Sequence, residues 1–104
     1  MKIEHIGIAI KSLETSDHLF ARLLGKHSYK QESVEREGVT TSFYEVGESK
    51  IELLEATNPE SPIAKFLDKR GEGVHHIAFG VENIFAEIER LKKEGFIFIS
   101  EEPK

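Results

Sequence analysis

Two adjacent histidines in an apolar segment are the first residues of this sequence whose type and position could support chemistry. The segment "GEGVHHIAFGV", residues 71–81, has the β-branched and aromatic composition of a buried strand. Neutral imidazole is a good metal ligand and a good general base. Because side chains alternate between the two faces of a strand, His75 and His76 should point in opposite directions. We therefore expect only one of them to share a site with any given third residue.

An internal repeat indicates which histidine that is. The segment "IEHIGIAI" (3–10) resembles "VHHIAFGV" (74–81), and the match aligns His5 with His76. In each copy the residues that follow the aligned histidine on the same strand face are small, namely Gly7 and Ala9 in the first copy and Ala78 and Gly80 in the second. Small side chains beside a histidine leave a concavity, which favours a pocket over a packed core.

A carboxylate in another apolar segment completes a candidate ligand set. Glu52 lies within "KIELLEA", where a charge without a partner would be costly. Two imidazoles and a carboxylate can hold a divalent cation, so His5, Glu52 and His76 are candidate metal ligands, and Glu52 is also a candidate catalytic residue. Half-buried histidines with ordinary hydrogen bonds would explain the same pattern, and the residues alone do not decide between the two. We expect a solvated side chain at Glu55 and surface positions for the helix and loop histidines, His18 and His27.

The elements that must position these residues follow from hydrophobic periodicity and turn signals. Each copy of the repeat predicts a strand, an N-cap (Ser12 or Asn83), an amphipathic helix and a terminating glycine (Gly25 or Gly95). Between the copies we expect three strands and a short connecting helix, and after the second helix a short strand. Their approximate ranges are 28–36, 39–46 and 49–56 for the strands, 58–71 for the connector and 96–100 for the last strand. The predicted fold class is α+β.

Composition limits the function classes without choosing one. A chain of 104 residues is large enough for one domain with a modest core. The net charge of −5 and the lack of a basic stripe argue against nucleic-acid binding, and no apolar run is long enough to span a membrane. The absence of cysteine fits a cytoplasmic protein, and "MKIEHIGIAI" lacks the layout of a signal peptide.

The segments "EHIGIAI", "KIELLEATNPESPIAKFLDKRGEGVHHIAFGVENI" and "EEPK" closely resemble the methylmalonyl-CoA epimerases. These form a branch of the vicinal-oxygen-chelate (glyoxalase/bleomycin resistance-like) superfamily. The resemblance implies a single domain over 1–104 made of paired βαβββ modules. Module 1 would cover about 1–57, a connector helix about 58–71 and a partial module 2 about 72–104, truncated after its helix and the first following strand. It also implies that His5 and His76 are metal ligands and that Glu52 occupies a third ligand position.

The same resemblance implies a function. It predicts interconversion of (2R)- and (2S)-methylmalonyl-CoA, by metal-assisted abstraction and return of the α-proton, in a cytoplasmic homodimer. The substrate would be an acyl-CoA thioester and the metal Co, Ni, Zn or Mn. The fourth ligand and principal acid/base would lie on a strand after Lys104. The alternatives are a glyoxalase I (lactoylglutathione lyase)-type enzyme, against which "SPIAKFL" argues, and a metal-free small-molecule binding or resistance module on the same fold.

Overall fold

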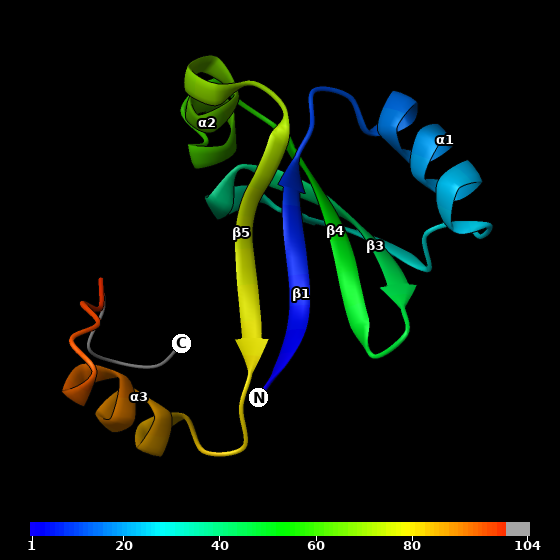
Figure 1. The fold of residues 1–104 in the computed structure, drawn as a ribbon. Coiled ribbons are helices and arrows are strands. Elements are labelled where there is room, and N and C mark those ends of the chain that lie inside the picture. The colour runs from blue at the N-terminus through cyan, green and yellow to red at the C-terminus, as the bar shows by residue number, and fades with distance from the viewer. Residues whose placement is uncertain (100–104) are drawn as a thin grey trace.

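The first strand lies inside the sheet, between two segments that are distant in sequence. The computed structural model describes residues 1–99, which form one five-stranded sheet in the order β2-β3-β4-β1-β5 (Figure 1). β1 pairs in parallel with β4 and antiparallel with β5, and the other neighbouring strands are antiparallel. The two copies of the sequence repeat therefore lie side by side. The strands are β1 (Lys2–Ala9), β2 (Lys30–Val34), β3 (Val39–Val46), β4 (Ser49–Ala56) and β5 (Gly73–Gly80).

The first and third helices begin at the predicted N-caps, and the first ends at the predicted glycine, whereas the C-cap of the third is Glu94 and not Gly95. The side chains of Ser12, Ser61 and Asn83 each accept a hydrogen bond from a backbone N–H in the first turn of the helix that follows. Gly25 ends the first helix with φ 73°, a left-handed conformation that glycine adopts at little cost. No helix among residues 1–99 is long and apolar enough to cross a membrane. The helices are α1 (Leu13–Leu24), α2 (Pro62–Arg70) and α3 (Ile84–Lys93), and the α+β class is confirmed.

Two helices cover opposite faces of the sheet. A buried cluster between α1 and the sheet consists of Ile10, Leu13, Tyr44 and Leu53. On the other face, α2 places Ile63 in a second buried cluster, which also contains Ala9, Val39 and Leu54. α2 covers that face only near one end of β1 and β4, so the middle of the face stays open (Figure 1).

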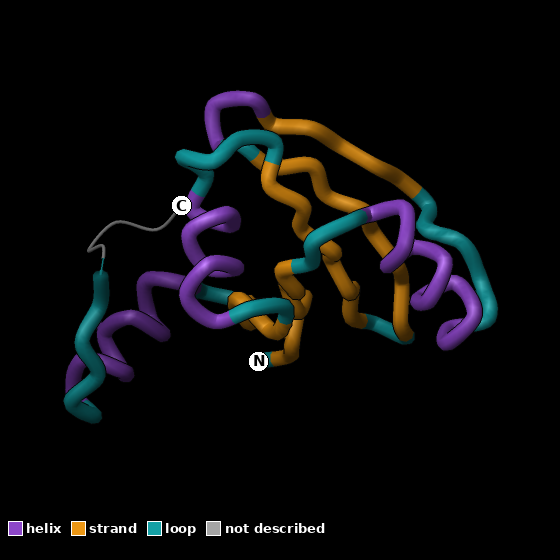
Figure 2. Tube along the Cα trace, turned by 90° about the horizontal axis from the view of Figure 1, so that it is seen from above, coloured by secondary structure: helices purple, strands orange, loops and turns teal. Residues whose placement is uncertain are grey.

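The end of the described chain differs from the prediction. Residues 96–99 form no strand, and Ser100 lies outside the described residues. A strand needs a hydrogen-bonded neighbour, whereas the N–H of Phe96 donates to the carbonyl of Leu91 at 3.0 Å and closes the end of α3. Figures 1 and 2 both show α3 at the margin of the molecule, away from the sheet. Phe79, which faces this side, is 58% exposed.

A buried polar network joins α1 to the sheet. The hydroxyls of Tyr44 and Ser42 donate to the carboxylate Oδ1 of Asp17 at 2.6 and 2.7 Å. Gln31 Nε2 donates to Oδ2 of the same carboxylate at 2.9 Å. Tyr44 and Ser42 are 1% and 0% exposed, so water cannot easily replace Asp17 as their acceptor.

Replacing Asp17 should therefore destabilise the fold. We expect Asp17→Ala to lower the free energy of unfolding by about 1–3 kcal/mol, because two buried hydroxyls lose a charged acceptor. Asp68→Ala in α2 is the matched control, since Asp68 is an exposed helical aspartate. Urea denaturation of both variants measures the difference. An Asp17→Ala midpoint no lower than that of Asp68→Ala would show that the network does not stabilise the fold.

The phenol of Tyr44 should ionise only at an unusually high pH. Burial, reinforced by the hydrogen bond to Asp17, raises the pKa of Tyr44 from 10.0 to about 12. Folding thus favours the protonated phenol, so this contribution to stability is complete below pH 10 and is lost as the pH rises towards 12. An ultraviolet absorption titration should show a tyrosine ionising near pH 12 that is missing from Tyr44→Phe. If the titration step that the wild-type protein shows and Tyr44→Phe lacks lies near pH 10, the prediction is wrong.

Candidate metal and active site

The pairing of β1 with β5 brings the two repeat-related histidines together. In the register, His5 lies opposite Ala78 and His76 lies opposite Gly7, so both histidines occupy the same face of neighbouring strands. Their Nε2 atoms are 3.0 Å apart, and the ring planes meet at 89°. The structure thus brings into direct contact two residues that are 71 positions apart in the sequence.

Gly7 makes room for this contact. The ring of His76 lies over Gly7, where an added Cβ would be only 2.2 Å from His76 Cε1. No side chain other than the hydrogen of glycine fits under the ring without displacing it. The small residue beside the histidine is therefore a requirement of the site, as the sequence pattern indicates.

Glu52 lies on the neighbouring strand at the same level. It is opposite Gly7 in the β1–β4 register, and its Oε2 is 3.4 Å from Nδ1 of His5. Burial raises the pKa of the Glu52 carboxyl, and the nearby His5 partly opposes this shift. Glu52 is thus a carboxylate whose basicity is increased, and it contacts the edge of the His5 ring opposite to the edge that faces His76.

A second carboxylate reaches His5, and the sequence analysis missed it. Glu4 Oε1 is 2.6 Å from Nδ1 of His5, and its Oε2 accepts a hydrogen bond from Lys50 Nζ at 3.0 Å. These two partners, His5 first, lower the pKa of Glu4. Strand alternation predicts Glu4 on the opposite face from His5. The sequence feature that could have pointed to Glu4 is the repeat, in which Glu4 occupies the same position as His75.

His75 also departs from the predicted alternation. Its Nδ1 lies 2.9 Å from Nδ1 of His76, so the expectation that the two rings point apart is wrong. The cause is a shift in the β1–β5 register, from Gly7 opposite His76 to Ile8 opposite Val74, which leaves His75 as an extra residue. A bulge of this kind lets consecutive side chains project on the same side of the strand. The edge of the His75 ring also packs against Phe66 of α2, with centroids 5.0 Å apart.

The remaining polar candidates lie outside this cluster. His18 and His27 are exposed, as expected, and line a shallow pocket on the α1 side of the sheet. Glu55, expected to be solvated, instead accepts a hydrogen bond from the N–H of Leu13 at 2.9 Å and so supports the start of α1.

The donor set at the histidines fits a divalent metal ion. Two imidazole nitrogens whose lone pairs meet at one point could both bind a single divalent cation. The observed Nε2–Nε2 distance is 3.0 Å. Burial, with smaller effects of His5 and His75, lowers the pKa of His76 and so favours the neutral imidazole that binds metals. Ligand atoms of Glu4, His5 and Glu52 lie within 4.8 Å of one another, a group that does not include His76.

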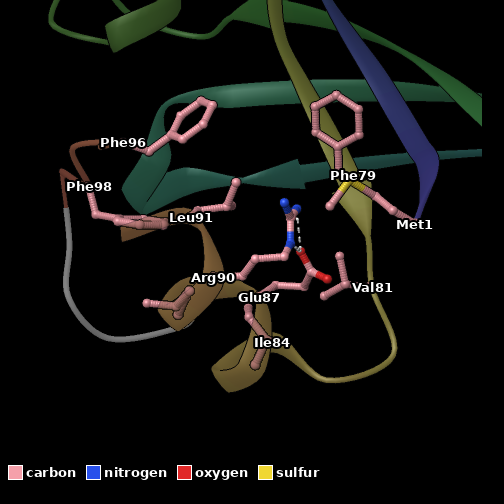
Figure 3. Close-up of a pocket in the computed structure, with 10 residues that line it drawn as sticks. Met1, Phe79, Val81, Ile84, Glu87, Arg90, Leu91, Phe96 and Phe98 are labelled. Atoms are coloured by element: carbon pink, nitrogen blue, oxygen red, sulfur yellow. Dashed lines mark hydrogen bonds and ion pairs between the residues drawn. The ribbon is translucent and has the colours of Figure 1, made fainter. Parts of the chain in front are cut away.

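A large cavity elsewhere lacks comparable chemistry. A space of about 540 Å³ lies between the end of β5 and α3 (Figure 3). Its walls are apolar apart from Glu87 and Arg90, which form an ion pair of 2.8 Å with each other. Phe79 lines it, whereas His76 is on the other face of β5 by strand alternation. We therefore place the candidate site at the histidines and not in this cavity.

Comparisons with known proteins show which family the chain is similar to. Over nearly its whole length the chain is 36% identical to the mitochondrial methylmalonyl-CoA epimerase of Homo sapiens, covering 99% of this chain and 59% of the human protein. It therefore spans less than two thirds of that relative. A hypothetical protein from Bacillus halodurans C-125 has the same fold with 46% identity and a TM-score of 0.90, covering 99% of this chain and 75% of that one.

A further structural relative was solved with a ligand. It is a variant of Streptomyces coelicolor methylmalonyl-CoA epimerase in complex with 2-nitronate-propionyl-CoA, with 32% identity and a TM-score of 0.82. The match covers 100% of this chain and 79% of that one. The similarity to epimerases expected from the sequence is confirmed. The model of the Glyoxalase/Bleomycin resistance protein/Dioxygenase superfamily matches residues 4–104, and the chain belongs to this superfamily.

Proposed function

We propose that this protein is a metal-dependent methylmalonyl-CoA epimerase that interconverts the (2R) and (2S) forms of its substrate. The observation that carries the proposal is the pair of facing Nε2 atoms, 3.0 Å apart, in a chain similar over nearly its full length to epimerases. An acyl-CoA thioester is the substrate class, since a related epimerase binds a CoA ligand. The cytoplasmic location and the homodimer stay predictions.

His5, His76 and Glu52 would hold the divalent cation, for which Co²⁺, Ni²⁺, Zn²⁺ and Mn²⁺ are the candidates. The two imidazoles offer nitrogen lone pairs at one point, and Glu52 supplies negative charge beside them. A bound cation supplies Lewis-acid stabilisation of the negative charge that develops on the thioester oxygen when the α-proton leaves.

The chain's own residues must also move a proton. Epimerisation removes the proton from C2 of the acyl group and returns a proton to the opposite face of the same carbon. Glu52 would be placed to accept or return a proton, since it lies beside His5 and burial raises the pKa of its carboxyl. The resemblance to the epimerases would place the principal acid/base on a strand after Lys104.

Proton exchange at C2 tests the proposal directly. In D₂O with added Co²⁺, the protein should replace the C2 proton of methylmalonyl-CoA by deuterium faster than the protein-free background, as followed by ¹H NMR. Replacing His76 by alanine should slow the exchange by about 100-fold or more, since even changes behind a metal ligand cost about 10–100-fold. His27→Ala, in an exposed loop, is the control and should retain the exchange.

Two results would contradict this function. One is a rate that neither Co²⁺ nor the His76→Ala change affects. The other is turnover of the methylglyoxal–glutathione adduct in place of C2 exchange, which would indicate a glyoxalase I-type enzyme. Elemental analysis showing no bound metal, together with no stabilisation by Co²⁺, would favour a metal-free binding module.

Gly7 offers a second test, which does not depend on the substrate. Gly7→Ala should weaken Co²⁺ binding by about 10–100-fold, because the new Cβ would displace the His76 ring that lies 2.2 Å from it. Gly73→Ala in β5 is the matched control, since a Cβ there meets nothing within 4 Å. Visible absorption during a Co²⁺ titration measures both affinities. Equal Co²⁺ affinities for the two variants would show that His76 is not a metal ligand.

A further inference from the structure

β1 and β5 carry matching irregularities beside the two site histidines. In β1 the register passes from Ile3 opposite Phe79 to His5 opposite Ala78, which leaves Glu4 as an extra residue. The shift in β5 leaves His75 as the extra residue in the same way. Glu4 and His75 occupy equivalent positions of the sequence repeat, so the two bulges are related by the same approximate symmetry as the two histidines.

Each extra residue contacts the same ring nitrogen of the histidine that follows it. Glu4 Oε1 lies 2.6 Å from Nδ1 of His5, and Nδ1 of His75 lies 2.9 Å from Nδ1 of His76. In a regular strand, neighbouring side chains point to opposite faces and could not make these contacts. The bulges are therefore what places a partner on Nδ1 of each histidine.

The carboxylate partner indicates where the imidazole proton of His5 lies, and the proposal extends the same arrangement to His76. A carboxylate only accepts hydrogen bonds, so Nδ1 of His5 must carry the N–H that it donates to Glu4. The same role for His76 requires Nδ1 of His75 to be the acceptor, with the proton of His75 on its own Nε2. In the neutral rings the free lone pairs of His5 and His76 are then both on Nε2, and these are the two atoms that face each other.

Both extra residues are themselves held in place. Lys50 Nζ donates to the second oxygen of Glu4 at 3.0 Å. The edge of the His75 ring packs on Phe66, with an angle of 79° between the ring planes. The sheet supplies one of these supports and α2 the other.

We propose that Glu4 and His75 are positioning residues, which fix the Nδ1–H tautomers of His5 and His76 and so present both Nε2 atoms to one cation. The identity of the bound group rests on the proposed function, whereas the tautomers do not. Histidine ligands in metal sites commonly donate their second ring nitrogen to an outer partner, which sets the ring orientation. Here that partner is in each case the preceding residue of the same strand.

The tautomers can be read without activity. Long-range ¹H–¹⁵N correlation spectra of the ¹⁵N-labelled protein, metal-free and with Zn²⁺, report which ring nitrogen is protonated. We expect protonated Nδ1 in both His5 and His76 in both states. In Glu4→Met, which keeps the length of the side chain and removes the acceptor, His5 should populate the Nε2–H tautomer. His75→Phe keeps an aromatic ring against Phe66 and should have the same effect on His76.

Metal affinity is the second measurement. Glu4→Met and His75→Phe should each weaken Co²⁺ binding by about 10–100-fold, as expected for loss of an outer partner. Glu48→Met, at an exposed turn residue, removes the same charge and should change neither the spectra nor the affinity.

Each of the following outcomes either supports or overturns the positioning roles of Glu4 and His75. An unprotonated Nδ1 in the wild-type rings, or variants that leave both tautomers and affinity unchanged, would overturn the proposal. An effect of Glu48→Met equal to that of Glu4→Met would also overturn it, since only general electrostatics would then be at work. Tautomers that respond as expected in a protein that binds neither Zn²⁺ nor Co²⁺ would support the positioning roles and reject the metal-dependent function.

Discussion

The antiparallel pairing of β1 with β5 is the interaction on which the candidate site depends. It joins two segments of one sequence repeat and places His5 and His76 on a common face, with Gly7 and Ala78 opposite them. The same central strand pairs with β4 on its other side and so brings Glu52 level with Gly7. Three candidate ligands from three strands thus converge because β1 lies between the other two. Neither β4 nor β5 alone could supply such a set.

Several parts of this arrangement follow from the sequence. Alternation of side chains and the repeat single out His5 and His76, and the apolar surroundings of Glu52 mark it as a carboxylate that needs a partner. The predicted N-caps Ser12 and Asn83 locate the starts of α1 and α3, and Gly25 locates the end of α1. These features are local, or are repeated within the sequence, so they can be read without knowledge of the strand order.

The remaining features depend on pairing that no local pattern encodes. The bulges at Glu4 and His75 arise from the register of two distant strands, and they overturn the alternation that would send these side chains to the far face. The apolar stripe of 96–99 resembles a strand in composition, but a strand exists only where a neighbour accepts its hydrogen bonds. The apolar residues of α3 likewise lack a packing partner among the described residues, so they line an open cavity instead of a packed core (Figure 3).

The energetics of the site argue against a purely structural role for the histidines. If Nδ1 is protonated in both rings, as proposed above, the facing Nε2 atoms are two acceptors 3.0 Å apart, and neither satisfies the other. The raised pKa of Glu52 shows that burial disfavours its charged form, and Gly7 gives up side-chain packing in the middle of the sheet. A divalent cation would offset both electrostatic costs at once, because it satisfies the two lone pairs and balances the carboxylate. A metal-free pocket would offset neither, which is why the arrangement favours the epimerase over a binding module on the same fold.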